Sequence, residues 1–228
     1  MKNIYALICA RGGSKGIKNK NLLLINNKSL IARSVLIAKK CKYIKKVFVS
    51  TDSKKIAQEA RRHGAEVPFL RPKNLSKDNT PEIQVWKHAI NYLEKVKNLK
   101  IDFIVNIPTT APLRTLNDIN SCIKKAIKNN FDMIFTVTEA YRNPFFNLVK
   151  IKKNRVTTVF QNSQIIFRRQ DAPKFYDLNT ICYVIKVKFI KNSKTIFSGR
   201  SGIVQIPKER SIDIDDKIDY KIAKLLSK

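Results

Sequence analysis

Cysteine is scarce in the sequence, and the four cysteines (Cys9, Cys41, Cys122 and Cys182) include no C-x-x-C pair. Their scatter through apolar and helical patterns is typical of buried thiols and argues against disulfides or a zinc site. Long apolar runs are absent too, since no segment approaches the ~18 uninterrupted apolar residues of a membrane span. The first residues lack the apolar region and the small-residue cleavage site of a secretion signal. We therefore expect a cytoplasmic protein that does not enter the membrane.

Acidic residues are also few: 17 Asp and Glu face 46 Lys and Arg, which leaves a formal net charge of +29. Such a balance favours partners that carry phosphates, and nucleic acid is the first candidate. The lysines are dispersed along the chain, however, and the sequence has no basic tail, recognition helix or aromatic ladder within a basic stripe. A nucleic-acid-binding protein without catalysis is therefore kept only as an alternative. We expect the charge to form a solvated surface that attracts anionic substrates.

Apolar residues make up 43% of the 228 positions and alternate between short β-branched runs and stretches of helical period. This order predicts one domain over residues 1–228 with an α/β fold, a three-layer α/β/α, Rossmann-like and mainly parallel sheet. Ligands gather at the carboxyl ends of the strands in such sheets. Asn117 and Asp118 are the expected cap of one helix. The expected strands cover residues 4–10, 47–50, 67–70, 101–107, 133–137 and 181–185, and the expected helices cover 29–41, 54–63, 81–95, 117–126 and 216–225.

The pattern changes after residue 140, where short strands and extended basic stretches replace the alternation. We interpret residues from about 140 to 180 as a small β-rich lobe inserted into the domain, because a core strand follows it. Exposed strand edges in such a lobe favour pairing with a second copy of the chain. We therefore expect a homodimer.

The most informative motif follows the first expected strand, where the apolar run breaks into the basic loop RGGSKG at residues 11–16. Glycines permit a sharp turn that exposes backbone N–H groups, and Arg and Lys add fixed positive charge. The spacing fits neither the P-loop pattern G-x-x-x-x-G-K-[ST] nor the dinucleotide pattern G-x-G-x-x-G. The loop predicts a site for an anion with several oxygens, and a nucleoside triphosphate is the main candidate. The alternative interpretation is a solvated turn.

A second motif is the acidic run near the C-terminus, SIDIDD at residues 211–216. In an extended segment Asp213 and Asp215 point to the same side, while the two isoleucines face the core. Two carboxylates with this spacing can hold Mg²⁺ against phosphate oxygens. The alternative is helix capping, because Asp215 and Asp216 precede an expected helix and would suit its positive end. Both interpretations can hold at once, with Asp213 on the metal and Asp216 on the cap.

Several motifs, taken in order, resemble those of the acylneuraminate cytidylyltransferases (CMP-sialic acid synthetases), which have a nucleotide-diphospho-sugar transferase-like fold. They are ARGGSKGI with KNL, VSTD, GAEVPFLRP, PLR, RRQD and ERSIDID, and together they span nearly the whole chain. The resemblance implies transfer of CMP from CTP to the anomeric hydroxyl of a nonulosonic (sialic-acid-like) sugar, with release of pyrophosphate. It implies Mg²⁺ as the cofactor and a role in surface-glycan (lipopolysaccharide or capsule) biosynthesis. The main barrier of such a reaction is electrostatic, because negative charge must be positioned and neutralised at phosphorus.

The resemblance also implies roles for individual residues. Arg11, Lys15 and Lys20 match the basic residues that bind the triphosphate, and together with Asp213 they are the implied catalytic residues. Asp213 and Asp215 match the metal-binding aspartates. The implied nucleotide site comprises Ala10, Arg11, Gly12, Gly13, Ser14, Lys15, Asn21, Arg71 and Thr80, with Arg71 on the cytidine side.

The acceptor side is implied by the RRQD motif, because a sugar carboxylate pairs well with a bidentate guanidinium. The resemblance favours Arg168 or Arg169 for this contact, and the alternative for the pair is a solvated basic surface. The other implied acceptor contacts are Arg142, from the same or the partner subunit, Gln170 and Asn179.

The chain departs from the family pattern beside the expected acceptor pocket. Pro108 stands where many members have glutamine, Ala111 stands where they have serine, and Asn179-Thr180-Ile181 replaces Asn-Gly-Ala. The acceptor is therefore open among N-acetylneuraminate, a legionaminic- or pseudaminic-type sugar and 3-deoxy-manno-octulosonate. A nucleotidyltransferase that uses another base or sugar phosphate is the alternative among enzymes.

Overall fold

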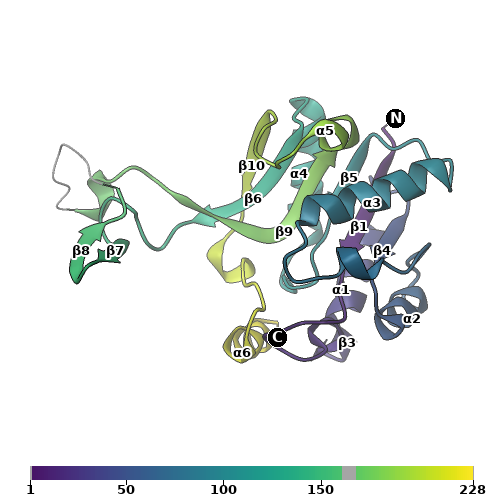
Figure 1. The fold of residues 1–228 in the computed structure, drawn as a ribbon, viewed down its shortest axis with the longest axis horizontal. Coiled ribbons are helices and arrows are strands. Elements are labelled where there is room, and N and C mark those ends of the chain that lie inside the picture. Colours follow the sequence, from purple (N-terminus) through teal and green to yellow (C-terminus); the bar gives the residue numbers. More distant parts are fainter. Residues whose placement is uncertain (1, 161–167, 228) are drawn as a thin grey trace.

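A six-stranded sheet lies between helices in the computed structural model, which describes residues 2–160 and 168–227 (Figure 1). The strand order is β10-β6-β9-β5-β1-β4. Its pairs are parallel except where β9 runs antiparallel to β5 and β6, so the predicted mainly parallel α/β sheet is confirmed. The strands are β1 (Ile4–Cys9), β4 (Val47–Ser50), β5 (Phe103–Asn106), β6 (Met133–Glu139), β9 (Tyr176–Lys186) and β10 (Ser201–Gln205).

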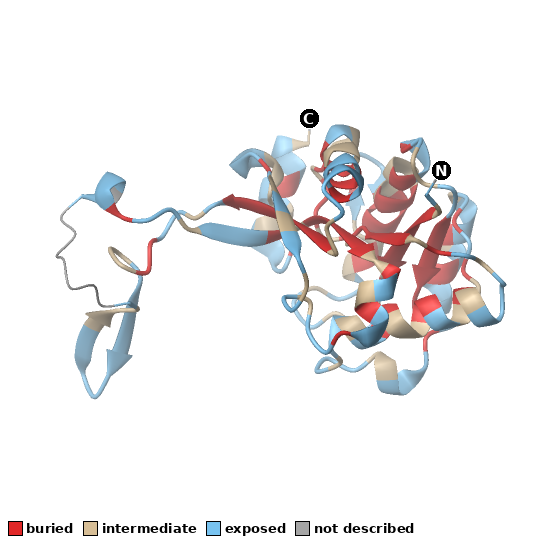
Figure 2. Ribbon diagram, turned by 90° about the horizontal axis from the view of Figure 1, so that it is seen from above, coloured by how far each residue is buried: buried red, intermediate tan, exposed pale blue. Residues whose placement is uncertain are grey.

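Helices cover both faces of the sheet because its inner strands are apolar on both sides. In β1, Ala6 and Ile8 pack with apolar residues of α1, α2 and α4, whereas Tyr5 and Leu7 pack with those of α3 and α5. The predicted three layers are thus confirmed, and Figure 2 shows the buried residues concentrated in the sheet. The helices are α1 (Leu30–Lys40), α2 (Lys54–Arg62), α3 (Glu82–Lys95), α4 (Leu116–Lys128), α5 (Val187–Asn192) and α6 (Lys217–Leu226).

The C-terminal helix returns to the N-terminal part of the chain. Ile214 and Ala223 form a small apolar cluster with Ile25 and Leu30, so α6 packs beside the hairpin that precedes α1 (Figure 1). This hairpin consists of β2 (Leu24–Ile25) and β3 (Lys28–Ser29). Four short 3-10 helices complete the connections, namely η1 (Lys20–Leu22), η2 (Lys73–Leu75), η3 (Arg169–Asp171) and η4 (Lys208–Arg210).

Several expected elements differ from the structure. Residues 67–70 form no strand, because only isolated bridges at Glu66 and Leu70 reach the β4 edge. The expected strand 181–185 is the second half of the longer β9, and α5 and β10 were not predicted. The cap of α4 is Thr115, which precedes the expected cap residues Asn117 and Asp118: its side chain accepts from the Asp118 backbone, and the Asp118 carboxylate accepts from the Thr115 backbone.

The inserted lobe is an arm that extends away from the sheet (Figures 1 and 2). Beyond the ends of β6 and β9 it carries the hairpin of β7 (Val149–Lys152) and β8 (Arg155–Thr158). Phe145, Phe160 and Phe175 pack against one another as its small apolar centre. Ile151 is nevertheless 74% exposed and Val156 is 63% exposed, so the hairpin leaves apolar surface uncovered. Dimerisation through this lobe stays a prediction.

Two further findings concern the few cysteines and the lack of long apolar runs in the sequence. The four cysteines are free thiols, and three of them are buried. Among residues 2–160 and 168–227, no helix combines the length and the apolarity that crossing a membrane requires.

Candidate active site

A cavity of about 360 Å³ opens where the carboxyl ends of β1 and β5 meet the start of α3. This is the edge at which parallel sheets hold their ligands. The predicted site residues that line it are Arg11, Ser14, Lys15, Lys20, Asn21, Arg71, Thr80 and Asp215. Asp78, Thr109 and Thr110 line it as well, together with Cys9 and Glu82, to which the sequence analysis assigned no role in the site.

The basic loop presents two cations to a carboxylate across the cavity. Lys15 Nζ lies 2.6 Å from Asp78 Oδ2, and Arg11 forms an ion pair with the same side chain. The hydrogen bond from Lys15, together with the charge of Arg11, lowers the pKa of Asp78 below its usual value. Asp78 belongs to the segment between Arg71 and Thr80, so this segment is tied to the anion-binding loop. Position 78 belongs to no motif in the sequence, although it lies between Arg71 and Thr80, which are both expected in the nucleotide site.

Hydrogen bonds from three segments hold the basic loop in place. The Gly12 N–H donates to Asp52 Oδ1 at 2.8 Å, and Asn21 Nδ2 donates to the Arg11 carbonyl at 2.8 Å. Thr109 Oγ1 donates to Asn21 Oδ1, which ties the loop to the end of β5. Asn21 therefore shapes the loop in addition to lining the cavity. Three residues expected in the nucleotide site, Ala10, Gly12 and Gly13, belong to the loop but do not line the cavity.

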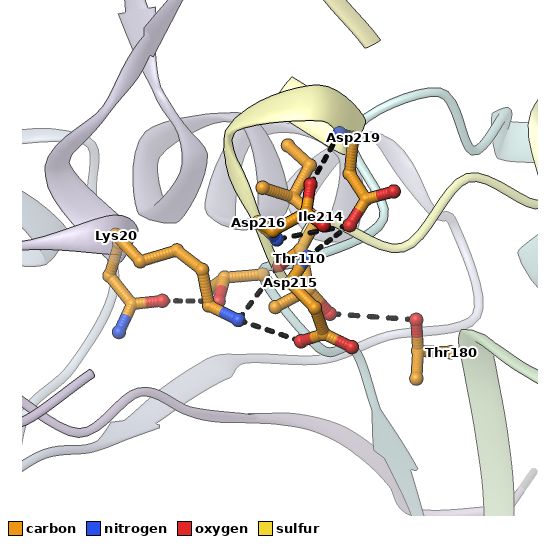
Figure 3. A network of polar contacts seen from close by, with 9 residues as sticks. Lys20, Thr110, Thr180, Ile214, Asp215, Asp216 and Asp219 are labelled. Carbon is orange, nitrogen blue, oxygen red and sulfur yellow. Dashed lines mark hydrogen bonds and ion pairs between the residues drawn. The ribbon is translucent and has the colours of Figure 1, made fainter. Parts of the chain in front are cut away.

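Lys20 connects the loop to the C-terminal segment, as Figure 3 shows. Its Nζ donates to the Ile214 carbonyl at 2.7 Å and lies 3.1 Å from Asp215 Oδ1. The Ile214 N–H donates to the Thr110 carbonyl at 2.9 Å, which fixes the same segment to the loop after β5. Gly16 lies so close to it that an added Cβ would stand 2.2 Å from the Asp215 carbonyl oxygen.

The two candidate metal ligands alternate with isoleucines as the pattern predicts. Ile214 is fully buried, while the Asp215 side chain is 79% exposed and faces Lys20. Asp213 does not line the cavity, but its Oδ1 is buried and has no hydrogen-bond partner among the described residues. A buried carboxylate oxygen without a partner is unfavourable unless a cation or a donor completes it.

These carboxylates fit Mg²⁺, which binds one or two carboxylates together with phosphate oxygens. Within the described part of the chain no cluster of three or more His, Cys, Asp or Glu side chains is placed to hold a metal ion. Any cation at this site would therefore depend on substrate oxygens. The capping interpretation also holds, because the Asp216 carboxylate accepts from the Ile218 and Asp219 backbones at the start of α6.

The floor of the cavity offers both a donor and an acceptor. Arg71 is buried, and its Nε donates to Ser50 Oγ at 3.0 Å. The Glu82 carboxylate accepts from Asn106 Nδ2 at 3.1 Å, and desolvation raises the pKa of Glu82 against the opposing effect of this hydrogen bond. Burial raises the pKa of the Cys9 thiol to about 12, so it stays protonated at neutral pH and is no nucleophile. The floor is suited to recognising the polar edge of a neutral group.

The expected acceptor residues are not brought to this cavity. Arg142, Arg168 and Gln170 belong to the arm and do not line it. The Arg168 guanidinium pairs with Asp171, with 2.8 Å between Nε and Oδ2, and Arg142 stacks on the Tyr141 ring at 4.8 Å. The backbone of Arg169 lies in η3, and its side chain is outside the described structure.

Asn179 lies nearer to the site. It is on β9 and directly precedes Thr180, whose hydroxyl contacts the Thr110 hydroxyl (Figure 3). It is buried, and its Nδ2 has no partner among the described residues. The departures at Pro108 and Ala111 do not line the cavity, but they flank Thr109 and Thr110, which do. The sequence therefore indicates the right segment, but it does not show that Thr109 and Thr110 are the residues of this segment that line the cavity.

Comparison with known proteins decides the family. The family described as cytidylyltransferase matches residues 5–226. The chain belongs to the cytidylyltransferase family. A flagellin modification protein B of Campylobacter coli is 36% identical over 100% of this chain and 96% of its own length. A CMP-N,N'-diacetyllegionaminic acid synthase of Campylobacter jejuni is 35% identical over 99% and 95%, and a pseudaminic acid cytidylyltransferase of that species is 31% identical over 100% and 97%.

Solved cytidylyltransferases share the fold of this one. A CMP:2-keto-3-deoxy-manno-octonic acid synthetase complexed with CTP has a TM-score of 0.72 at 13% identity, over 99% of this chain and 98% of that chain. A 4-diphosphocytidyl-2C-methyl-D-erythritol synthase has a TM-score of 0.71 at 12% identity. The resemblance noted from the motifs is thus confirmed at the level of the family and the fold, and the protein is an enzyme that uses CTP.

The close approach of Gly16 to Asp215 gives a test of the site's construction. Gly16→Ala should lower the free energy of unfolding by about 1–3 kcal/mol, because the new methyl group displaces a backbone carbonyl that cannot rotate away. Gly13→Ala is the matched control, since its Cβ would meet nothing within 4 Å, and it should change stability by less than about 0.5 kcal/mol. Urea denaturation measures both, and equal stability of the two variants would contradict the packing described.

Proposed function

We propose that this cytidylyltransferase transfers CMP from CTP to the anomeric hydroxyl of a nonulosonic acid. The hydroxyl oxygen forms a bond to the α-phosphorus and loses its proton to solvent, the bond from that phosphorus to the β-phosphate oxygen breaks, and pyrophosphate leaves. The observation that carries the proposal is the convergence of Arg11, Lys15 and Lys20 on one cavity beside Asp215. Positive charges in fixed positions stabilise the charge that develops on phosphoryl oxygens.

The nucleotide half of the proposal rests on the two ends of the cavity. The triphosphate would lie along the basic loop, with Arg11 and Lys15 at its outer part and Lys20 nearer the acceptor. The base would reach the floor, where Arg71 and Glu82 supply a donor and an acceptor within hydrogen-bonding distance of neighbouring polar groups. Because CTP is the substrate, we further propose that the reaction takes place in the cytoplasm.

Mg²⁺ is the proposed cofactor, held by Asp213 and Asp215. When bound there, the cation would polarise the α-phosphate and help to deprotonate the attacking hydroxyl. The chain's own part is to present these carboxylates beside the triphosphate, and Lys20 positions Asp215 for this through the contact at 3.1 Å. Lys20 contacts only Oδ1 of Asp215, so the second carboxylate oxygen has no contact with Lys20.

The acceptor half of the proposal needs a second subunit. Arg142, Arg168 and Gln170 lie on the arm that extends away from the sheet, and none of them lines the cavity. We propose a homodimer in which the arm of one subunit supplies these residues to the cavity of the other. The uncovered apolar surface of the β7–β8 hairpin supports such pairing, because strand edges with exposed apolar side chains bind a partner readily.

The acceptor itself is proposed from the relatives. Two of them are named for legionaminic and pseudaminic acids, and their identity to this chain is 35% and 31%. A relative named for N-acylneuraminate, from Escherichia coli, is 26% identical. We therefore propose a legionaminic- or pseudaminic-type sugar ahead of N-acetylneuraminate and 3-deoxy-manno-octulosonate.

Pyrophosphate release tests the proposed reaction. The purified protein is incubated with CTP and Mg²⁺ and with each of the four sugar acids, and ATP, GTP and UTP replace CTP in parallel. Release should require CTP and should be greatest with a legionaminic- or pseudaminic-type sugar. Absence of release with every sugar, although CTP binds, would reject the acceptor class, and absence of CTP binding would reject the nucleotide assignment.

Loss of either candidate ligand tests the metal site. Asp213→Asn and Asp215→Asn should each lower kcat/KM by about 100-fold or more, because one anionic ligand to the cation is removed at the reacting phosphate. They should also raise the Mg²⁺ concentration needed for half-maximal rate. Glu209→Gln is the control, since it removes an exposed carboxylate four residues earlier. Full Mg²⁺-dependent activity of Asp213→Asn would show that the metal lies elsewhere.

Mixing of two inactive variants tests whether the arm acts on the partner subunit. Arg168→Ala lacks an arm contact, and Lys15→Ala lacks a triphosphate contact. A heterodimer of the two has one complete site only if the arm reaches across, so an equal mixture after exchange should recover about a quarter of wild-type activity. The control Arg155→Ala, on the hairpin, should stay active. No recovery on mixing would place the arm over its own cavity.

A further inference from the structure

A second pocket lies on the other side of the segment that follows β5. It has a volume of about 340 Å³ and lies between α1 and residues 111–116. None of its lining residues also lines the catalytic cavity. Its basic residues are Lys28, Arg33, Lys40 and Arg114, and among the described residues that line it none is acidic.

Arg114 is a buried, positively charged residue of this pocket. It is the last residue of the Pro112-Leu113-Arg114 motif, to which the proposed reaction assigns no role. Its side chain donates to Ser34 Oγ at 3.0 Å and to the Pro108 carbonyl, while its Nε is buried without a partner. Burial lowers the pKa of Arg114 to about 10, although a guanidinium at this pKa is still charged at neutral pH. The carboxylates of Asp213 and Asp118 favour its charged form, but among the described residues neither forms an ion pair with it, and Asp118 pairs with Arg210 at 2.8 Å.

Arg33 adds a second positive charge beside the first. It donates to the Pro112 carbonyl at 3.0 Å, its Nε is buried without a partner, and burial lowers its pKa. Within the described chain neither Arg33 nor Arg114 forms an ion pair. Two guanidinium groups that line one pocket repel each other, and the burial of Arg114 adds to the cost of its charge. An anion with several oxygens in the pocket would offset both charges at once.

The start of α1 adds to the positive electrostatic potential of this pocket. This helix begins after Ser29, and its first turn contains no acidic side chain to offset the positive end of the helix dipole. Lys28 at the preceding hairpin lines the pocket as well. The apolar part of the lining, which includes Leu36 and Ile37, limits access of water to the guanidinium groups.

We propose that this pocket is a second anion site, separate from the catalytic cavity, which binds inorganic phosphate or the phosphate group of a small metabolite. The phosphate would lie between the guanidinium groups of Arg33 and Arg114, with Lys28 and Lys40 at the rim. The proposal does not depend on the sugar acceptor, since the residues that line this pocket lie outside the catalytic cavity.

Phosphate binding to a Lys15→Ala background tests this site, because that change weakens anion binding in the catalytic cavity. Inorganic phosphate is titrated calorimetrically at constant ionic strength, set with sodium chloride. Adding Arg33→Gln should weaken phosphate binding about tenfold or more, since one of the two guanidinium charges that line the pocket is lost. Adding Lys39→Gln, which removes one charge from the same helix outside the pocket, should change the affinity by less than about twofold.

Folding of the variants is followed by circular dichroism, and Lys28→Gln serves as a second probe because its side chain is exposed. It should also weaken phosphate binding, though less than Arg33→Gln. Phosphate affinity that is the same in the Arg33→Gln, Lys28→Gln and Lys39→Gln proteins would overturn the proposal. Activity with CTP plays no part in this readout, so a failure of the proposed function would leave the result unaffected.

Discussion

The catalytic cavity depends on the contacts that Lys20 makes with the Ile214 carbonyl and the Asp215 carboxylate. It joins residues 195 positions apart, and the Ile214 N–H on Thr110 adds the loop after β5 to the same junction. The three segments that line the cavity are therefore held together by contacts between distant parts of the chain, and α6 packs beside the β2–β3 hairpin in the same region. A site of this kind is shaped by non-local contacts, which give it rigidity and make it sensitive to substitutions far from the ligand.

Much of the fold could be predicted because it rests on local patterns. The alternation of buried strands and amphipathic helices is explicit up to Met133, and the basic loop ends a strand whose neighbours are apolar. The first part of β9 and the whole of β10 were missed for a physical reason: the first three residues of β9 are exposed and β10 has alternating exposure, so neither forms a continuous apolar run. The Thr115 cap was missed because Asn117 and Asp118 follow it after one leucine and are equally good capping residues.

The site was predicted less completely than the fold. Residues of the basic loop and Asp215 could be predicted from motifs, but Asp78 and Glu82 belong to no motif. Their place in the site depends on the residues that the fold brings into contact with them. The arm residues show the reverse case: their motif is explicit, yet the single chain holds them away from the cavity. The high positive charge has in part a local explanation, because the last turns of α1, α2 and α4 carry basic residues that complement the helix dipoles.

The ion pairs of Asp78 with Arg11 and Lys15 have a consequence for selectivity. In the free protein the cations of the basic loop already have an anionic neighbour, supplied by the chain itself. A ligand must offer more charge, or more oxygens, than one carboxylate before it can take that place. Chloride and simple monocarboxylates fall below this threshold, whereas a triphosphate, with several charges in a row, exceeds it. The loop thus discriminates among anions by valence before any base or sugar is recognised.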